Sequence, residues 1–216
     1  MRYLLIYLLL LPILIISQDN YQDFGTWTKL RLNYKINKKL ELTNKTESRT
    51  IDNSSYLNQF YTQFSIKKKI NKNFSNLLAY RIKSIFDNYG YLIENRFHYD
   101  FNYKKKINKL NLYIRLRSQY NIDPIGYNDF YERVRFKAAF EINKKINFYL
   151  YNELYLYVND PENISIYNKN RIGTGFEYKL NKDFNLELKY INISDFQIEK
   201  PETINILGLV LSIDLN

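Results

Sequence analysis

The chain has 216 residues, a formal net charge of +10 and no cysteine. Without cysteine there are no disulfides, no cysteine-ligated metals and no lipid attachment at a cleavage-site cysteine. The length suits one domain. A basic protein invites a nucleic-acid interpretation, but we expect no nucleic-acid partner, because the basic residues follow strand alternation and an export signal precedes them.

Residues 1–17 have the features of a secretory signal peptide. One positive charge at Arg2 precedes an apolar run that ends at Ile16, and the small residue Ser17 follows. The run is shorter than the roughly 20 residues of a spanning helix, which favours cleavage near Ser17 over an uncleaved anchor. The mature protein is therefore expected to be residues 18–216, exported and without a membrane-spanning helix.

Polar and apolar residues alternate along most of the remaining chain with the period of two that marks a two-faced β-strand. Tyr91, Phe97 and Tyr99, for example, alternate with Arg96 and Asp100. The alternation predicts strands over residues 26–36, 39–50, 56–70, 73–86, 91–107, 110–121, 129–142, 145–158, 170–180, 183–194 and 203–215.

Two architectures share this alternation. A soluble sandwich turns its apolar side inward, whereas a transmembrane barrel turns it toward lipid. Many of the runs exceed the roughly 5–6 residues of soluble strands, and 22 tyrosines and 14 phenylalanines could supply aromatic girdles. We therefore predict an all-β, antiparallel transmembrane β-barrel of 10–12 long strands. The eleven strands predicted above are an odd number, whereas bacterial barrels usually have an even number. Either residues 18–26 return through the lumen or one predicted strand is mistaken.

A short motif recurs at the expected hairpin turns, with steps of 34, 37, 35 and 38 residues between its copies. Its copies are KINKKL at 35–40, KINKNF at 69–74, KINKLN at 106–111, EINKKI at 141–146 and KLNKDF at 179–184. Such a period indicates a repeated unit, here a long β-hairpin. Because Asn tolerates a positive φ, each Asn-Lys pair predicts a tight turn, which we assign to the periplasmic side.

The segment from Asp23 to Trp27 reads D-F-G-T-W. With the signal peptide and the repeated K-[IL]-[NS]-K-K-[LF] hairpins, it resembles an outer-membrane family of Bacteroidota, domain-of-unknown-function family 2490. The resemblance covers nearly all of the mature chain. It implies a β-barrel and transfers no catalytic residues.

Alternate residues of a strand point to opposite faces, and we call this strand parity. By parity, the face expected to line the lumen carries more basic than acidic side chains. The candidates for lining it are Arg31, Arg81, Glu94, Arg96, His98, Asp100, Arg115, Arg117, Arg133, Arg135, Glu153, Glu177 and Lys189. His98 is the only histidine, and no G-x-S-x-G elbow accompanies it, so a polar lumen residue is favoured over a catalytic one. Tyr149, Tyr151, Tyr155 and Tyr157 share the inward face and suit either packing or a sugar or nucleobase path.

The expected location is the outer membrane of a Gram-negative bacterium, with outer-membrane lipid and the barrel-assembly machinery as partners. We expect no catalytic residues, cofactor or metal. Three functions stay open: a narrow pore for small anionic solutes, a non-conducting structural or surface-interaction barrel with an ion-paired lumen, and a membrane-embedded hydrolase.

Overall fold

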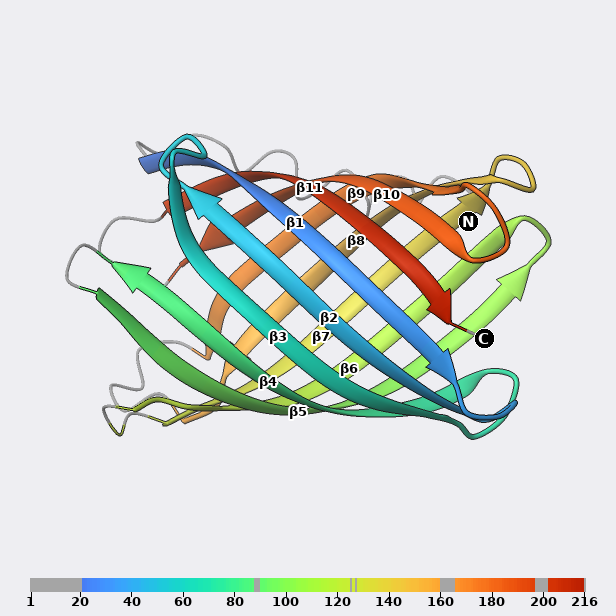
Figure 1. Ribbon diagram of the computed structural model, residues 1–216, viewed down its shortest axis with the longest axis horizontal. Helices are drawn as coiled ribbons and strands as arrows, with labels where there is room; N and C mark the ends of the chain where they lie inside the picture. Colours follow the sequence, from blue (N-terminus) through green and yellow to red (C-terminus); the bar gives the residue numbers. More distant parts are fainter. Residues whose placement is uncertain are drawn as a thin grey trace.

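The computed structural model describes residues 21–87, 90–124, 126, 128–159, 166–196 and 202–215. The expected signal peptide lies outside these residues. The described residues form eleven strands that close into one barrel (Figure 1). The strands are β1 (Tyr21–Lys35), β2 (Leu40–Ile51), β3 (Tyr56–Lys69), β4 (Phe74–Asp87), β5 (Gly90–Ile107), β6 (Leu110–Ile122), β7 (Asn128–Glu141), β8 (Ile146–Tyr157), β9 (Tyr167–Lys179), β10 (Phe184–Asp195) and β11 (Glu202–Leu215).

The expected all-β barrel is confirmed, and each predicted strand corresponds to one observed strand. The largest difference is at β1, which begins at Tyr21 rather than at Thr26. Gly25 lies inside this strand, where the wall comes close to β2. A Cβ added at Gly25 would lie 2.3 Å from the carbonyl oxygen of Thr50 on β2.

The odd strand number is real, and the barrel closes through one parallel seam. β1 pairs with β11 in parallel, with Trp27 opposite Gly208, and the neighbouring pairs β1–β2 and β10–β11 are antiparallel. Neither explanation of the odd count was right. No predicted strand was mistaken, and residues 21–26 belong to the wall instead of crossing the lumen.

The two ends of the barrel differ in their connections. The Asn-Lys turns and the end of β11 gather at one end, on the right in Figure 1, which we call the turn end. The β2–β3 connection, the ends of β4 and β6 and the start of β1 lie at the other end, which we call the loop end. No helix among the described residues is long and apolar enough to cross a membrane.

The Asn-Lys turns form where the motif predicts them, but mostly by a different mechanism. Only Asn108 has the expected positive φ, at 53°. In the other copies the Asn side chain caps the turn, as at Asn143, whose Oδ1 accepts hydrogen bonds from the backbone N–H groups of Lys145 at 2.8 Å and Ile146 at 2.9 Å. These turns hold four residues, so the side chain replaces the positive φ that a two-residue turn needs.

The two faces of the wall are those of a transmembrane barrel and not of a soluble sandwich. Large apolar side chains point outward, including Phe64, which is 58% exposed, and Leu78, which is 56% exposed. Charged side chains are buried inside, among them Glu47 and Asp100. An apolar exterior around a polar interior suits lipid outside and solutes inside.

Candidate lumenal site

The lumen between the described strands holds three cavities, two of which lie in series. The cavity at the loop end has a volume of about 420 Å³ and is lined by residues such as Gln59, Tyr131 and Lys169, close to the loop-end termini of their strands. A second cavity of about 370 Å³ lies toward the turn end, where Lys67 and Lys104 contribute to its wall. Long side chains that project from opposite walls narrow the barrel between them.

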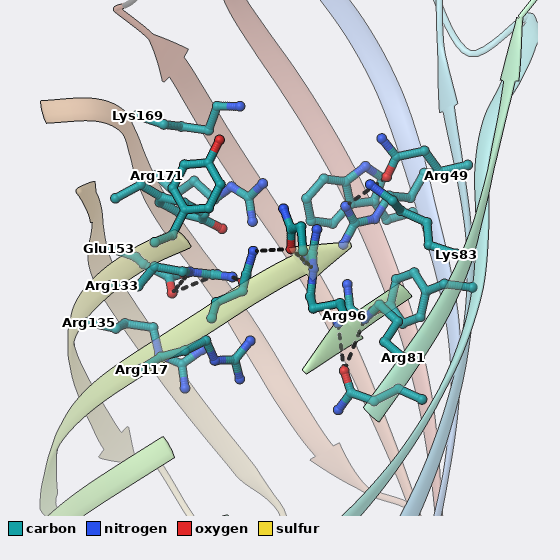
Figure 2. A pocket seen from close by; sticks show the side chains of 18 of the residues that line it. Arg49, Arg81, Lys83, Arg96, Arg117, Arg133, Arg135, Glu153, Lys169 and Arg171 are labelled. Carbon is teal, nitrogen blue, oxygen red and sulfur yellow. Dashed lines mark hydrogen bonds and ion pairs between the residues drawn. The ribbon is translucent and has the colours of Figure 1, made fainter. Parts of the chain in front are cut away.

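The structure brings most of the expected lumen residues to the loop-end cavity. Its lining includes Arg31, Arg81, Glu94, Arg96, Arg115, Arg117, Arg133, Arg135, Glu153 and Lys189. Figure 2 shows Arg117, Arg133 and Arg135 on one side of this cavity and Arg49, Lys83 and Arg81 on the other. Asp100 lines the turn-end cavity, and Glu177 lines a further cavity of about 340 Å³ at the turn end.

His98 is 2% exposed and neither ring nitrogen has a hydrogen-bond partner among the described residues. It therefore has no serine or aspartate positioned to form a hydrolytic pair in that part of the chain. The described residues also contain no cluster of three or more His, Asp or Glu side chains that could hold a metal.

A chain of alternating arginine and aromatic side chains runs around the loop-end cavity. Arg81 lies 3.7 Å above the ring centroid of Tyr61, and Arg49 lies 3.9 Å above that of Trp27. Arg133 stacks on Tyr155 at 3.9 Å. Arg171 belongs to the same series of stacked side chains.

Further contacts join these pairs to one another. Arg49 is also 5.2 Å from the Tyr61 centroid, while Arg171 lies 5.4 Å from Trp27 and 4.7 Å from Tyr155. A desolvated cation on an aromatic face gains about 2 kcal/mol or more. Stacking fixes the planes of the guanidinium groups, so that their N–H edges have defined directions around the cavity.

Three buried carboxylates each bind two cations. Glu47 accepts from Lys29 and Arg49, both at 2.6 Å, and Glu153 accepts from Arg133 at 2.8 Å and from Arg115. Glu94 pairs with Lys83 at 2.8 Å and Arg96 at 3.0 Å. Since each acid is shared between two bases, the ion pairs leave the wall with an excess of positive charge.

Two of the inward tyrosines, Tyr149 and Tyr157, bind protein groups, whereas Tyr151 and Tyr155 line the loop-end cavity. The hydroxyl of Tyr149 donates to Glu187 at 2.5 Å, and Lys137 Nζ lies 3.7 Å from the centroid of its ring. Tyr157 donates to Asp129 at 2.8 Å. At Tyr149 and Tyr157 these contacts favour packing and cation positioning over recognition of a sugar or a nucleobase.

Several lining residues were absent from the expected set. Trp27 and Tyr61 could have been found from parity alone, because they alternate in phase with Lys29 and Gln63. Lys169 was missed because its strand begins at Tyr167, three positions before the predicted residue 170.

Comparison with models of protein families shows the family of this chain. The model of a family described as a protein of unknown function (DUF2490) matches residues 24–203. The chain belongs to this family. The family match begins at Phe24, within the D-F-G-T-W segment, and includes most of β1, all of β2 to β10 and the first two residues of β11. No curated protein sequence matches the chain.

Two solved structures are similar to this chain to different degrees. The NanC porin, in its rhombohedral crystal form, has 15% sequence identity and a TM-score of 0.52, with 79% of this chain and 85% of that chain covered. The translocator domain of the autotransporter NalP from Neisseria meningitidis has 9% identity and a TM-score of 0.41, with 78% and 72% covered. The likeness to the porin shows the shared barrel fold; the second TM-score is too low to add to it.

Proposed function

We propose that this protein is an outer-membrane barrel of a Gram-negative bacterium that forms a narrow pore for small anionic solutes. Export by residues 1–17 and insertion by the barrel-assembly machinery belong to this proposal. The apolar exterior supports contact with membrane lipid. Transport is favoured over catalysis because the described lumen holds cavities and cations but no hydrolytic pairing of His98.

The excess of cations around the loop-end cavity carries the proposal. Its basic lining residues are Lys29, Arg31, Lys45, Arg49, Arg81, Lys83, Arg96, Arg115, Arg117, Arg133, Arg135, Lys169, Arg171 and Lys189, whereas its acidic ones are Glu94, Asp129 and Glu153. Walls of low dielectric constant focus the electric field of these cations and raise the local concentration of anions. Rings of Arg and Lys favour anion passage in pores.

The test is the reversal potential of the purified barrel in a planar bilayer across a potassium chloride gradient. We expect selectivity for chloride that weakens near 1 M salt, where the Debye length falls to about 3 Å. Arg135→Glu should reduce the selectivity. The same change at Lys72, an exposed residue of the β3–β4 turn, should leave it unchanged. Cation selectivity of the unaltered protein would reject the proposal.

A second function, a non-conducting barrel with a packed ionic core, is favoured by the shared carboxylates. Glu47, Glu94 and Glu153 bridge neighbouring strands, as structural ion pairs do. The same bilayer experiment separates the two functions, because a closed core predicts no current at any salt concentration.

A further inference from the structure

The narrow region between the two cavities is built from residues that line both of them. These residues are Arg31, Lys45, Arg115, Arg117 and Arg135, and we call them the waist. A solute that passed from one cavity to the other would have to contact these side chains. The waist is entirely basic, which sets it apart from the rest of the lumen.

Strand register places like charges directly opposite one another in the waist. Arg31 on β1 pairs with Lys45 on β2, and Arg115 on β6 pairs with Arg135 on β7. The next inward position, Arg117, faces Arg133. Like charges at directly paired positions of a sheet are destabilising.

The same arrangement occurs where Arg81 faces Arg96, but there Arg96 binds Glu94 at 3.0 Å and Arg81 donates to Gln63 at 2.7 Å. At other inward positions Lys29 is paired with Glu47, Lys83 with Glu94, and Arg117 with Asp100, so these three cations have an acid on a neighbouring strand. Acidic residues at the inward positions of the waist would have pointed into the lumen in the same way. The waist differs because several of its paired cations have no such partner, and unfavourable arrangements of this kind occur characteristically at functional sites.

Protein carboxylates neutralise only part of the waist. Arg117 binds Asp100 through Nε–Oδ1 at 2.6 Å and Nη2–Oδ2 at 2.8 Å, and Arg115 shares Glu153 with Arg133. Within the described residues, Arg31, Lys45 and Arg135 form no ion pair.

The acids nearest to these cations already bind other groups. Glu153, which is near Arg135, binds Arg115 and Arg133, and Glu187, which is near Arg31, accepts from Tyr149. Lys45 lies within electrostatic reach of Arg31 and Arg117, which repel it. The Nε atoms of Arg31 and Arg115 are buried, and neither donates to an acceptor in the described part of the chain. Three basic side chains that form no ion pair in the described part of the chain surround one constriction, and this arrangement suits an anion that carries more than one charge.

We propose that the waist is a binding site for a doubly charged oxyanion such as sulfate or phosphate. Arg31 and Lys45 would contact it from one wall and Arg115 and Arg135 from the other. Guanidinium groups bind tetrahedral oxyanions through paired N–H donors, which a chloride ion cannot engage in the same way. The inference deepens the proposed pore function by naming the preferred class of solute and its binding point.

Bound anion should stabilise the barrel by relieving the repulsion between like-charge rungs. The probe is sulfate, with acetate at equal ionic strength as the singly charged comparison. The readout is the temperature at which the folded barrel, purified in detergent, loses its heat-modifiable gel migration. We expect a saturable rise with sulfate, with a midpoint concentration at least roughly tenfold below that of any acetate effect.

The double variant Lys45→Gln/Arg135→Gln should lose the saturable rise. Lys169→Gln is the matched control, because it removes a lumenal cation that lines only the loop-end cavity and pairs with Asp195 at 2.6 Å. Sulfate also stabilises proteins in general through exclusion from their surface, but that effect does not saturate and would be equal in all three proteins. An equal, non-saturating rise, or equal midpoints for sulfate and acetate, would overturn the site.

Current measurements separate this inference from the proposed function. Sulfate should slow the chloride current of the unaltered barrel, and the double variant should be less sensitive. A chloride-selective current that sulfate leaves unchanged would overturn the waist site while the pore stands. Saturable binding to a barrel that carries no current would overturn the pore while the waist site stands.

Discussion

The guanidinium group of Arg49 lies 3.9 Å from the ring centroid of Trp27, while its Nε donates to Glu47 at 2.6 Å. The stack joins β1 to β2 close to the parallel seam. It also links the only tryptophan of the chain to a buried carboxylate. One aromatic ring thus fixes the orientation of a lumenal cation and supports the closure of the barrel.

Trp27→Leu should lower the free energy of unfolding by about 3 kcal/mol, since it removes a buried ring and its cation–π contact. Trp27→Phe keeps an aromatic face below Arg49 and should cost less. Urea unfolding in lipid vesicles, followed by circular dichroism, measures both. Equal costs for the two variants would show that the contact with Arg49 contributes nothing beyond packing.

The outward face of β5 gives a test of the lipid contact. Phe97 is 47% exposed and points away from the lumen, so Phe97→Arg should cost about 2–4 kcal/mol near the middle of the membrane. Phe97→Leu, which keeps an apolar side chain, should be nearly neutral. The measurement is unfolding in vesicles.

Arg96→Gln on the inner face should cost less than Phe97→Arg, because Glu94 retains its bond to Lys83 at 2.8 Å. A greater cost for the inward change would mean that the exterior of the barrel does not contact lipid.

The faces of the strands were predictable because parity is a local property. Every second residue of β5 shares an environment, so Phe97 and Arg96 could be assigned without knowledge of their neighbours. The pairing of Trp27 with Gly208 could not be predicted, since it joins the two ends of the chain and no local pattern encodes it. The parallel seam was missed for that reason.

The sequence predicted which residues line the lumen, but it did not predict which of them face one another. Parity alone placed Arg31, Arg115 and Arg135 in the lumen. That Arg31 faces Lys45 depends on a four-residue turn, and a two-residue turn would shift the register of that rung. The mechanism of the Asn turns was missed because the same Asn-Lys pair serves turns of both lengths.

Asparagine has two roles in these turns, and glycine substitution separates them. Asn143→Gly should destabilise the barrel by about 1 kcal/mol, because the turn loses the side-chain cap on Lys145 and Ile146. Asn108→Gly should be neutral or slightly stabilising, since glycine adopts its φ of 53° without a steric cost. Refolding yield and urea midpoints of the two variants provide the measurement. Equal losses would mean that the side-chain cap at Asn143 contributes nothing.

Variants of the buried pair of Asp100 and Arg117 test whether the electrostatic potential inside the lumen is positive. Asp100 is 3% exposed and accepts two hydrogen bonds from Arg117. Breaking a buried ion pair by removing one partner costs about 3–5 kcal/mol when the other charge stays uncompensated. Asp100→Asn leaves Arg117 opposite Arg133 and within reach of Lys45, so we expect this full cost.

Arg117→Gln should cost distinctly less, because the remaining carboxylate of Asp100 lies within electrostatic reach of Arg115 and Arg133, which partly compensate it. The double variant Asp100→Asn/Arg117→Gln should then be more stable than Asp100→Asn alone. Unfolding free energies of the four proteins in vesicles complete a double-mutant cycle and give the coupling directly. If Arg117→Gln proved the more damaging change, the surroundings of the pair would not be dominated by positive charge. In that case the anion-attracting lumen and the waist site would both lose their electrostatic basis.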